Sequence, residues 1–121
     1  MIRLILRLCA LLLVLGAVGA APVAADARDD ARRQVAFGIE VAQRGLWREA
    51  IYRWERAVEI DPTYAAAYNN LAIAYEHDGD LDKARTAYER ALALDPGNEF
   101  ITQNHELFRE INDRTNRESN Q

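Results

Sequence analysis

Cysteine is nearly absent from this chain of 121 residues, which contains only Cys9. One cysteine, placed in an apolar N-terminal stretch, excludes a disulfide framework within the chain and offers no thiol pair for redox chemistry. Proline and glycine are also scarce, with three and six residues respectively. Because these two residue types end helices and form turns, their scarcity leaves room for long, uninterrupted helices.

Basic residues and histidines are also few. The chain carries 15 basic and 19 acidic residues, so its formal net charge is −4. This balance offers no basic footprint for nucleic acid or for an anionic membrane surface. His77 and His105 have no companion histidine or cysteine at metal-ligand spacing. Phosphate-binding loops and nucleophile motifs are missing. We therefore expect a protein that is not an enzyme, with no catalytic residues, no metal, no cofactor and no small-molecule substrate.

The N-terminal segment, residues 1–25, differs in composition from the rest of the chain. A short basic start that ends at Arg3 leads into an apolar run from Leu8 to Ala21, and residues 23–25 are small. This order is typical of a bacterial secretory signal peptide that is cleaved after Ala25. We therefore predict that residues 1–25 are a signal peptide and that the protein is exported to the periplasm. The alternative is an uncleaved anchor in the inner membrane, for which the run is short.

Two consecutive stretches of equal length, 31–64 and 65–98, align with each other without a gap. Nine of their aligned positions are identical, and most others are replaced in kind, as Phe37 is by Leu71. A fixed period of this length is typical of stacked helix hairpins. The chain is thus predicted to contain a tandem structural repeat.

The second stretch shows how each hairpin is built. Apolar residues recur at helical spacing over residues 65–78 and again over residues 81–94. Gly79 allows the chain to turn between the two segments, and Asp80 is placed to cap the second helix. Asp95 is expected to cap the helix that follows.

This unit resembles the tetratricopeptide repeat, a 34-residue helix hairpin with large residues, small residues and a final proline at fixed positions. The second stretch supplies Tyr68, Leu71, Ala72, Tyr75, Ala84, Tyr88 and Pro96 at those positions. The first stretch supplies Phe37, Gly38, Val41, Ala50, Trp54 and Pro62, with Gln34 where a large apolar residue is usual. The resemblance implies an all-α fold, a short right-handed α-solenoid of two helix hairpins.

The segments beside the repeats complete the predicted organisation. Residues 26–34 are a charged linker that overlaps the start of the first repeat helix. Residues 99–111 are expected to form a capping helix, with one apolar stripe against the second repeat and a polar outer side. Residues 112–121 contain no apolar residue and are predicted to be disordered.

In the family that the repeat resembles, the first helices of the repeats line a concave groove that binds peptides. The matching positions here are Arg32, Val35, Ile39 and Gln43, then Asn69, Asn70, Ile73, Glu76 and His77, and finally Asn104. Val35, Ile39 and Ile73 are predicted to form an apolar strip. Asn70 and Asn104 are predicted to pair with the backbone of an extended peptide, because a carboxamide both donates and accepts.

These features favour a non-enzymatic scaffold of the bacterial cell envelope that binds a protein or an extended peptide in its groove. Some members of the family hold a C-terminal carboxylate with basic residues at the positions of Val35 and Ile39. The apolar residues found here argue against chaperone C-terminal tails as ligands. The alternative function is a structural subunit that associates with itself, or a membrane-anchored assembly factor if residues 1–25 are retained.

Overall fold

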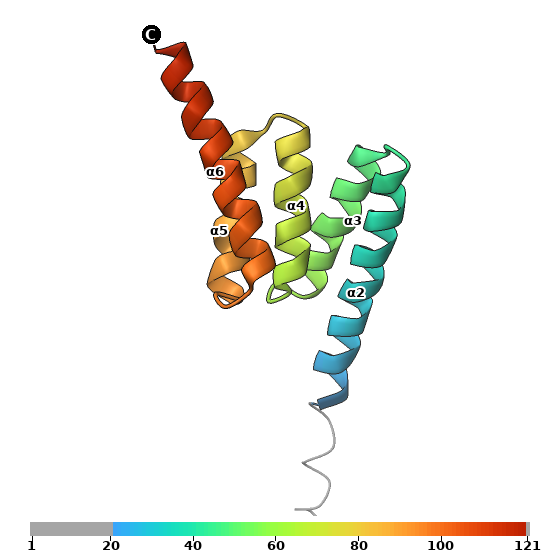
Figure 1. Cartoon of the computed structure of the whole chain (residues 1–121). Coiled ribbons are helices and arrows are strands. Elements are labelled where there is room, and N and C mark those ends of the chain that lie inside the picture. Colours follow the sequence, from blue (N-terminus) through green and yellow to red (C-terminus); the bar gives the residue numbers. More distant parts are fainter. Residues whose placement is uncertain (1–20, 121) are drawn as a thin grey trace, which may run out of the picture.

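The computed structural model describes residues 21–120, which form five helices and no strand. In chain order these are α2 (Ala21–Gln43), α3 (Trp47–Ile60), α4 (Ala65–His77), α5 (Leu81–Leu94) and α6 (Glu99–Ser119). Helices α2, α4 and α6 run in one direction, and α3 and α5 return between them (Figure 1). The all-α, solenoid-like fold predicted from the sequence is confirmed.

Local sequence signals set most of the helix ends. Gly45 and Gly79 both have a φ of 78°, a backbone conformation that glycine adopts without strain. The side chain of Asp80 accepts a hydrogen bond from the Lys83 amide and caps α5, as predicted. The predicted cap of the next helix was wrong, because Asn98 and not Asp95 caps α6. The Asn98 side chain accepts from the amides of residues 100 and 101 and donates to the Asp95 carboxylate.

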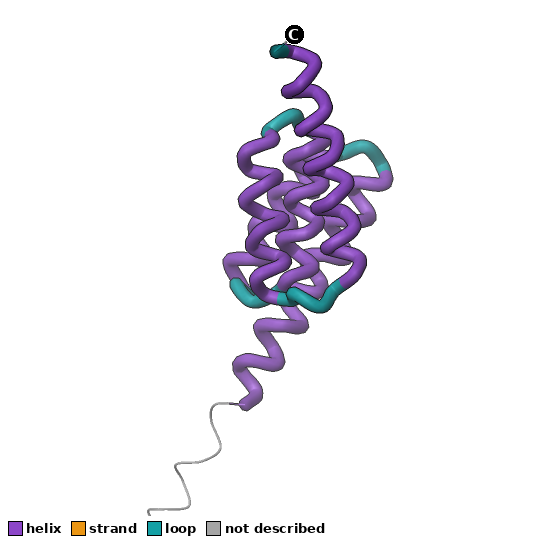
Figure 2. Tube along the Cα trace, turned by 60° about the vertical axis from the view of Figure 1, so that its left-hand side comes forward, coloured by secondary structure: helices purple, strands orange, loops and turns teal. Residues whose placement is uncertain are grey.

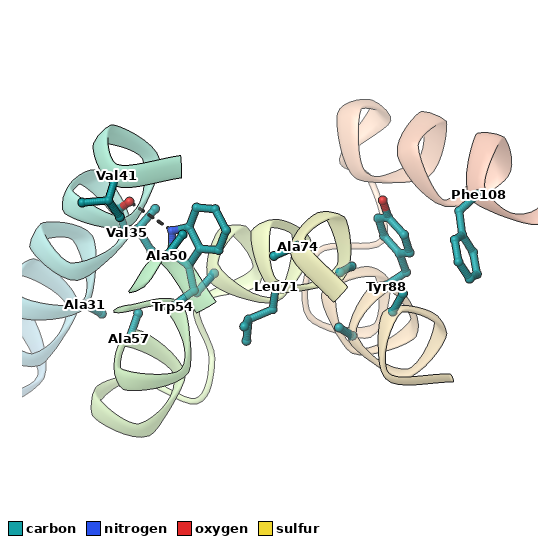
Figure 3. Packing of buried hydrophobic residues seen from close by; sticks show 14 residues of the cluster. Ala31, Val35, Val41, Ala50, Trp54, Ala57, Leu71, Ala74, Tyr88 and Phe108 are labelled. Carbon is teal, nitrogen blue, oxygen red and sulfur yellow. Dashed lines mark hydrogen bonds between the residues drawn. The ribbon is translucent and has the colours of Figure 1, made fainter. Parts of the chain in front are cut away.

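Small and large residues alternate in the core, as Figure 3 shows. Alanines without exposed surface lie where the helices of each hairpin cross, at positions 50, 57, 84 and 91. Their lack of a long side chain allows the close approach that packed helices need. Trp54, Tyr88 and Phe108 are the largest side chains of this core and are almost completely buried. Close packing of the helices at the alanines, together with burial of the large aromatic side chains, therefore stabilises the stack.

The repeat register explains which helix faces are apolar. At two positions of each first helix the side chain points toward the preceding repeat. In α4 and α6 those side chains are buried and apolar, whereas in α2, which has no preceding repeat among the described residues, they are charged and exposed. The two sets are Ala67 with Ala74 and Ile101 with Phe108, against Arg33 with Glu40. The face of α2 that a further repeat would cover is thus solvated.

The C-terminal helix is longer than predicted. It continues through residues 112–119, whose composition predicted a disordered tail. Asn112 is buried and donates to the Phe108 carbonyl oxygen at 2.8 Å. Arg114 pairs with Glu110 one turn earlier at 2.6 Å. Since no proline or glycine follows residue 97, local pairs of this kind let the helix propagate without an apolar face.

The outer side of α6 was predicted to be polar, and this prediction was wrong. Ile101 and Phe108 are buried against the second hairpin, whereas Phe100, Leu107 and Ile111 remain exposed. The outer side therefore carries three large apolar residues. The sequence contained both stripes, and the crossing of α6 with α5 selects which one is covered.

Helix α2 begins before the first repeat, so residues 26–34 are part of one continuous helix. Figure 2 shows this extension and the end of α6 projecting from opposite ends of the stack. The Arg28 guanidinium pairs with the Asp61 carboxylate, donates to the Thr63 hydroxyl at 2.9 Å and lies 4.9 Å from the centre of the Tyr64 ring. Burial alone would raise the pKa of Asp61, but hydrogen bonds from Thr63 and Arg28 outweigh it and hold that pKa below its ordinary value. The extension is therefore anchored at the α3–α4 turn.

The predicted signal peptide lies mostly outside the described residues, which begin at Ala21. Within residues 21–120, no helix combines the length and the apolar composition that a membrane span requires.

Candidate protein-binding groove

A groove of about 270 Å³ lies between the first helices of the two repeats. Its walls come from α2 and α4, and α3 supplies its floor. The lining is almost entirely apolar, with carboxamides at its margin: Ile39, Ala42, Gln43, Trp47, Trp54, Asn70 and Ile73. Ile39 and Ile73 occupy the same position of successive repeats, so the fold brings equivalent side chains into the lining of one groove.

Trp54 determines the depth of the groove. Its indole N–H donates to the Val35 carbonyl oxygen at 3.2 Å, as drawn in Figure 3. Gly38 leaves the space that the ring occupies, because a Cβ atom at this position would lie 2.3 Å from the indole nitrogen. The ring is therefore held flat under α2, and its apolar surface becomes the floor beneath Ile39 and Ile73.

An aromatic pair lies at one end of the groove, where Trp47 is part of the lining. The rings of Trp47 and His77 are stacked, with their centres 4.1 Å apart and their planes 20° from parallel. Trp47 opens α3 and His77 ends α4, so the pair ties the two hairpins together at the end where α2 and α4 finish. A ligand bound at this end of the groove would contact the Trp47 side chain.

Of the residues predicted for the groove, four line it together: Ile39, Gln43, Asn70 and Ile73. His77 lies beside this lining, stacked on Trp47. Glu76 lies on the same helix, where its carboxylate accepts a hydrogen bond from the Tyr88 hydroxyl at 3.1 Å. Burial, together with the Glu76 carboxylate, raises the pKa of Tyr88 well above its ordinary value. Glu76 thus serves the contact between α4 and α5.

Val35 and Asn69 do not belong to the groove, which corrects the prediction. They occupy the same repeat position and are only 6% and 5% exposed. That position faces the next first helix along the stack, so it is covered wherever such a helix follows. The equivalent residue of α6, Gln103, has no helix after it among the described residues and is exposed. The apolar strip therefore consists of Ile39 and Ile73 without Val35.

Arg32 and Asn104 lie away from the lining. Arg32 is exposed and lies 3.5 Å from Asp29, one turn earlier in α2. The Asn104 side chain donates to the carboxamide oxygen of Asn69 at 3.1 Å, so it joins α6 to α4. The predicted row of amides along the groove is thus reduced to Asn70, since Ala36 holds the corresponding position in α2.

The pairing of Trp47 with His77 was not predicted from the sequence, and Trp54 was predicted only as one of the large residues of the repeat. A signal for the floor was present, because Gly38 and Trp54 occupy positions of the repeat where a small residue faces a large one. No periodic signal identifies the Trp47–His77 stack, since it joins the start of a helix in one hairpin to the end of a helix in the other.

A second groove of about 550 Å³ lies on the opposite side of α4, between α3 and α5. Its floor is formed by Val58, Tyr68, Leu71, Tyr75 and Ala87, and its rim by Glu55, Asp82, Lys83, Thr86 and Arg90. We call it the convex groove. The Tyr75 hydroxyl donates to the Glu55 carboxylate at 2.8 Å. Burial and this carboxylate raise the pKa of Tyr75, so its phenol remains a neutral donor at physiological pH.

Neither groove contains a cluster suited to catalysis or to metal binding. Among residues 21–120, no group of three or more histidine, cysteine, aspartate or glutamate side chains is placed to hold a metal ion. The lining of both grooves is dominated by aliphatic and aromatic carbon. Such surfaces bind the side chains of other proteins by burial of apolar area.

Residues 65–98 match the family model described as tetratricopeptide repeat, and residues 40–79 match the one described as TPR repeat. This part of the chain therefore carries tetratricopeptide repeats, which are modules for protein–protein interaction. The match over 65–98 has the same bounds as the second stretch found by internal comparison.

Curated relatives share the repeat region. The chain is 36% identical over 73 residues to the tetratricopeptide repeat domain-containing protein PYG7, chloroplastic, of Arabidopsis thaliana, covering 60% of this chain and 24% of that protein. It is 42% identical over 55 residues to the Hsp70-Hsp90 organizing protein of Triticum aestivum, covering 46% and 10%. It is 33% identical over 82 residues to the type IV pilus assembly protein PilF of Pseudomonas aeruginosa, covering 67% and 32%. The chain thus spans between a tenth and a third of the length of these relatives.

Proposed function

We propose that this protein is a non-enzymatic scaffold that holds a segment of a partner protein in the groove between α2 and α4. The observation that carries this proposal is the apolar pair Ile39 and Ile73 above the Trp54 ring, lining an open groove that only a few polar groups border. Ile39 is 42% exposed beside this apolar lining, so its burial against a partner would contribute to the binding free energy.

The partner is expected to be recognised mainly through apolar side chains. Asn70 and Gln43 lie at the margin, where their carboxamides can fix the orientation of a bound backbone. A longer row of amides is missing from the described lining, so backbone pairing adds little to the binding free energy. Selectivity for one or two apolar side chains follows from this arrangement.

The proposed setting is the bacterial cell envelope, reached by export of the chain. The composition of residues 1–25 and the absence of cysteine after Cys9 support this setting. Two relatives are named as an organizing protein and as an assembly protein, and such names suit a scaffold. A membrane-anchored assembly factor is the alternative if the N-terminal segment is retained.

The groove is tested by Ile39→Asp, with Leu81→Asp as a matched control. The two side chains are 42% and 41% exposed, so both substitutions leave the core intact, but only the first lies in the groove. The partner is isolated from an envelope fraction with the unmodified protein and its affinity is measured by calorimetry. Loss of one buried isoleucine costs about 1.5–3 kcal/mol, so binding should weaken at least about tenfold for Ile39→Asp and stay unchanged for Leu81→Asp. Equal affinities for all three proteins would contradict the proposal.

Export is tested on the protein itself. If residues 1–25 are cleaved, the intact mass of the purified protein will correspond to a chain that begins at Asp26. Loss of Arg3 and Arg7 would leave 13 basic and 19 acidic residues, a net charge of −6. A protein that keeps residues 1–25 and sediments with the membrane fraction would instead establish the anchored alternative.

A further inference from the structure

Helix α6 carries an apolar stripe that no other described helix covers. Phe100, Leu107 and Ile111 are 69%, 57% and 47% exposed. The helix is already held in place by its other side, where Phe108 lies against Tyr88 with ring centres 5.3 Å apart. The three exposed residues recur at intervals of seven and four, so they form one line along the helix. We call this line the α6 stripe.

The convex groove has the length of the part of the stripe between Phe100 and Leu107. Along α4 it extends from Tyr68 to Tyr75, which is two helical turns or about 10 Å. Phe100 and Leu107 are separated by the same two turns. A volume of about 550 Å³ is in the range of sites that enclose a drug-sized ligand. The groove therefore has room for side chains from one face of a single helix.

Charges of opposite sign lie beside the two surfaces along one edge, and the rim of the groove carries the carboxylates of Glu55 and Asp82 in addition to its cations. Glu99 and Glu106 lie on α6 to one side of the stripe, two turns apart. Lys83 and Arg90 lie on the α5 rim of the groove, at the same spacing. Both cations are held over aromatic rings of the floor, at 5.5 Å from the Tyr75 ring and 5.8 Å from the Tyr68 ring. Lys83 also lies 3.6 Å from the Asp80 carboxylate within its own chain. Two carboxylates on α6 at the same spacing as these two rim cations favour one register of the helix in the groove.

We propose that the α6 stripe of one copy of this chain binds in the convex groove of a second copy. The α6 of the same copy is excluded, because it lies against the face of α5 that carries Arg85 and Glu89. The groove uses the face with Lys83, Thr86 and Arg90. The contact joins two different surfaces, so it is heterologous, and each added copy leaves one stripe and one groove open for the next. The concave groove with Ile39 and Ile73 lies on the other side of α4 and is not consumed by the contact.

The proposal predicts concentration-dependent assembly of the purified full chain, measured by analytical ultracentrifugation. Two variants each disrupt one of the two surfaces that form the contact. Leu107→Asp removes the stripe and keeps the groove, and the double variant Lys83→Glu with Arg90→Glu reverses the rim and keeps the stripe. All three side chains are exposed, and circular dichroism checks that the helix content is unchanged. If Leu107→Asp loses helix, Leu107→Ser takes its place.

Each variant alone should sediment as a monomer, and an equimolar mixture of the two should form a one-to-one dimer that grows no further. This result follows only if a stripe meets a groove. A second measurement adds Glu99→Lys and Glu106→Lys to the rim variant, whose assembly should then be restored because both charge rows are reversed. Assembly of the rim variant without these changes would show that α6 pairs with α6 and would overturn the proposal. Wild-type protein that stays monomeric at every concentration would overturn it as well.

Discussion

The substitution Trp54→Ala is expected to lower the free energy of unfolding by about 3–5 kcal/mol, the range for deletion of a large buried aromatic side chain. Single domains are stable by only about 5–15 kcal/mol, and an array of two repeats is shorter than the three that such folds usually need. The variant should therefore be largely unfolded at moderate urea concentration. Urea titration followed by far-UV circular dichroism measures the change.

A matched variant, Trp54→Phe, separates packing from hydrogen bonding. Phenylalanine keeps an aromatic ring beside Gly38 but cannot donate to the Val35 carbonyl oxygen. That oxygen lies within α2 and keeps its helical partner, so the loss should be smaller, about 1–2 kcal/mol. If Trp54→Ala cost less than Trp54→Phe, the indole would not be the floor that joins α2, α3 and α4.

Most of the fold was predictable because it depends on local chemistry. The helix of residues 81–94 has the predicted bounds, and Asp80 caps it. Gly79 takes the positive φ that the turn was expected to need. These features depend on neighbours a few residues away, so one sequence contains all the information that determines them.

The prediction failed where an outcome depends on which surfaces meet. Both apolar stripes of α6 satisfy the helical period, and only the crossing with α5 decides that Phe108 is covered and Leu107 is not. The end of α6 has no apolar residue after Ile111. Its helix depends instead on side-chain pairs such as Arg114 with Glu110, each of which is too weak to be decisive in a sequence.

The candidate site was predicted in part for the same reason. Ile39 and Ile73 were identified because the repeat period carries them to equivalent places on parallel helices. Val35 and Asn69 were misplaced because their position faces the next first helix, and a comparison of two repeats does not reveal that contact. The Trp47–His77 stack joins residues that share no repeat position. Periodicity thus predicts which residues share a face of each helix, whereas the contacts between helices are known only from the structure.

Replacement of Gly38 by alanine is the second change with a large expected effect. Alanine favours a helix over glycine by about 1 kcal/mol, so a gain in stability would be expected if the site were open. The added Cβ would instead lie 2.3 Å from the Trp54 indole nitrogen and 2.8 Å from two ring carbons. Trp54 is buried, so the ring cannot swing into solvent. Overfilling of a packed site costs about 1–3 kcal/mol and occasionally more, and we expect a net loss of about 1–2 kcal/mol.

Gly97→Ala is the matched control, because nothing lies within 4 Å of a Cβ atom at that position. It should leave the melting temperature unchanged or raise it slightly. The double variant Gly38→Ala with Trp54→Leu then tests the cause of the loss. A smaller side chain at position 54 leaves room for the new methyl group, so alanine at position 38 should cost less in that background, with a coupling free energy of about 0.5–3 kcal/mol. Additive losses in this cycle would mean that Gly38 is required for some reason other than the tryptophan ring, and the account of the groove floor would have to be abandoned.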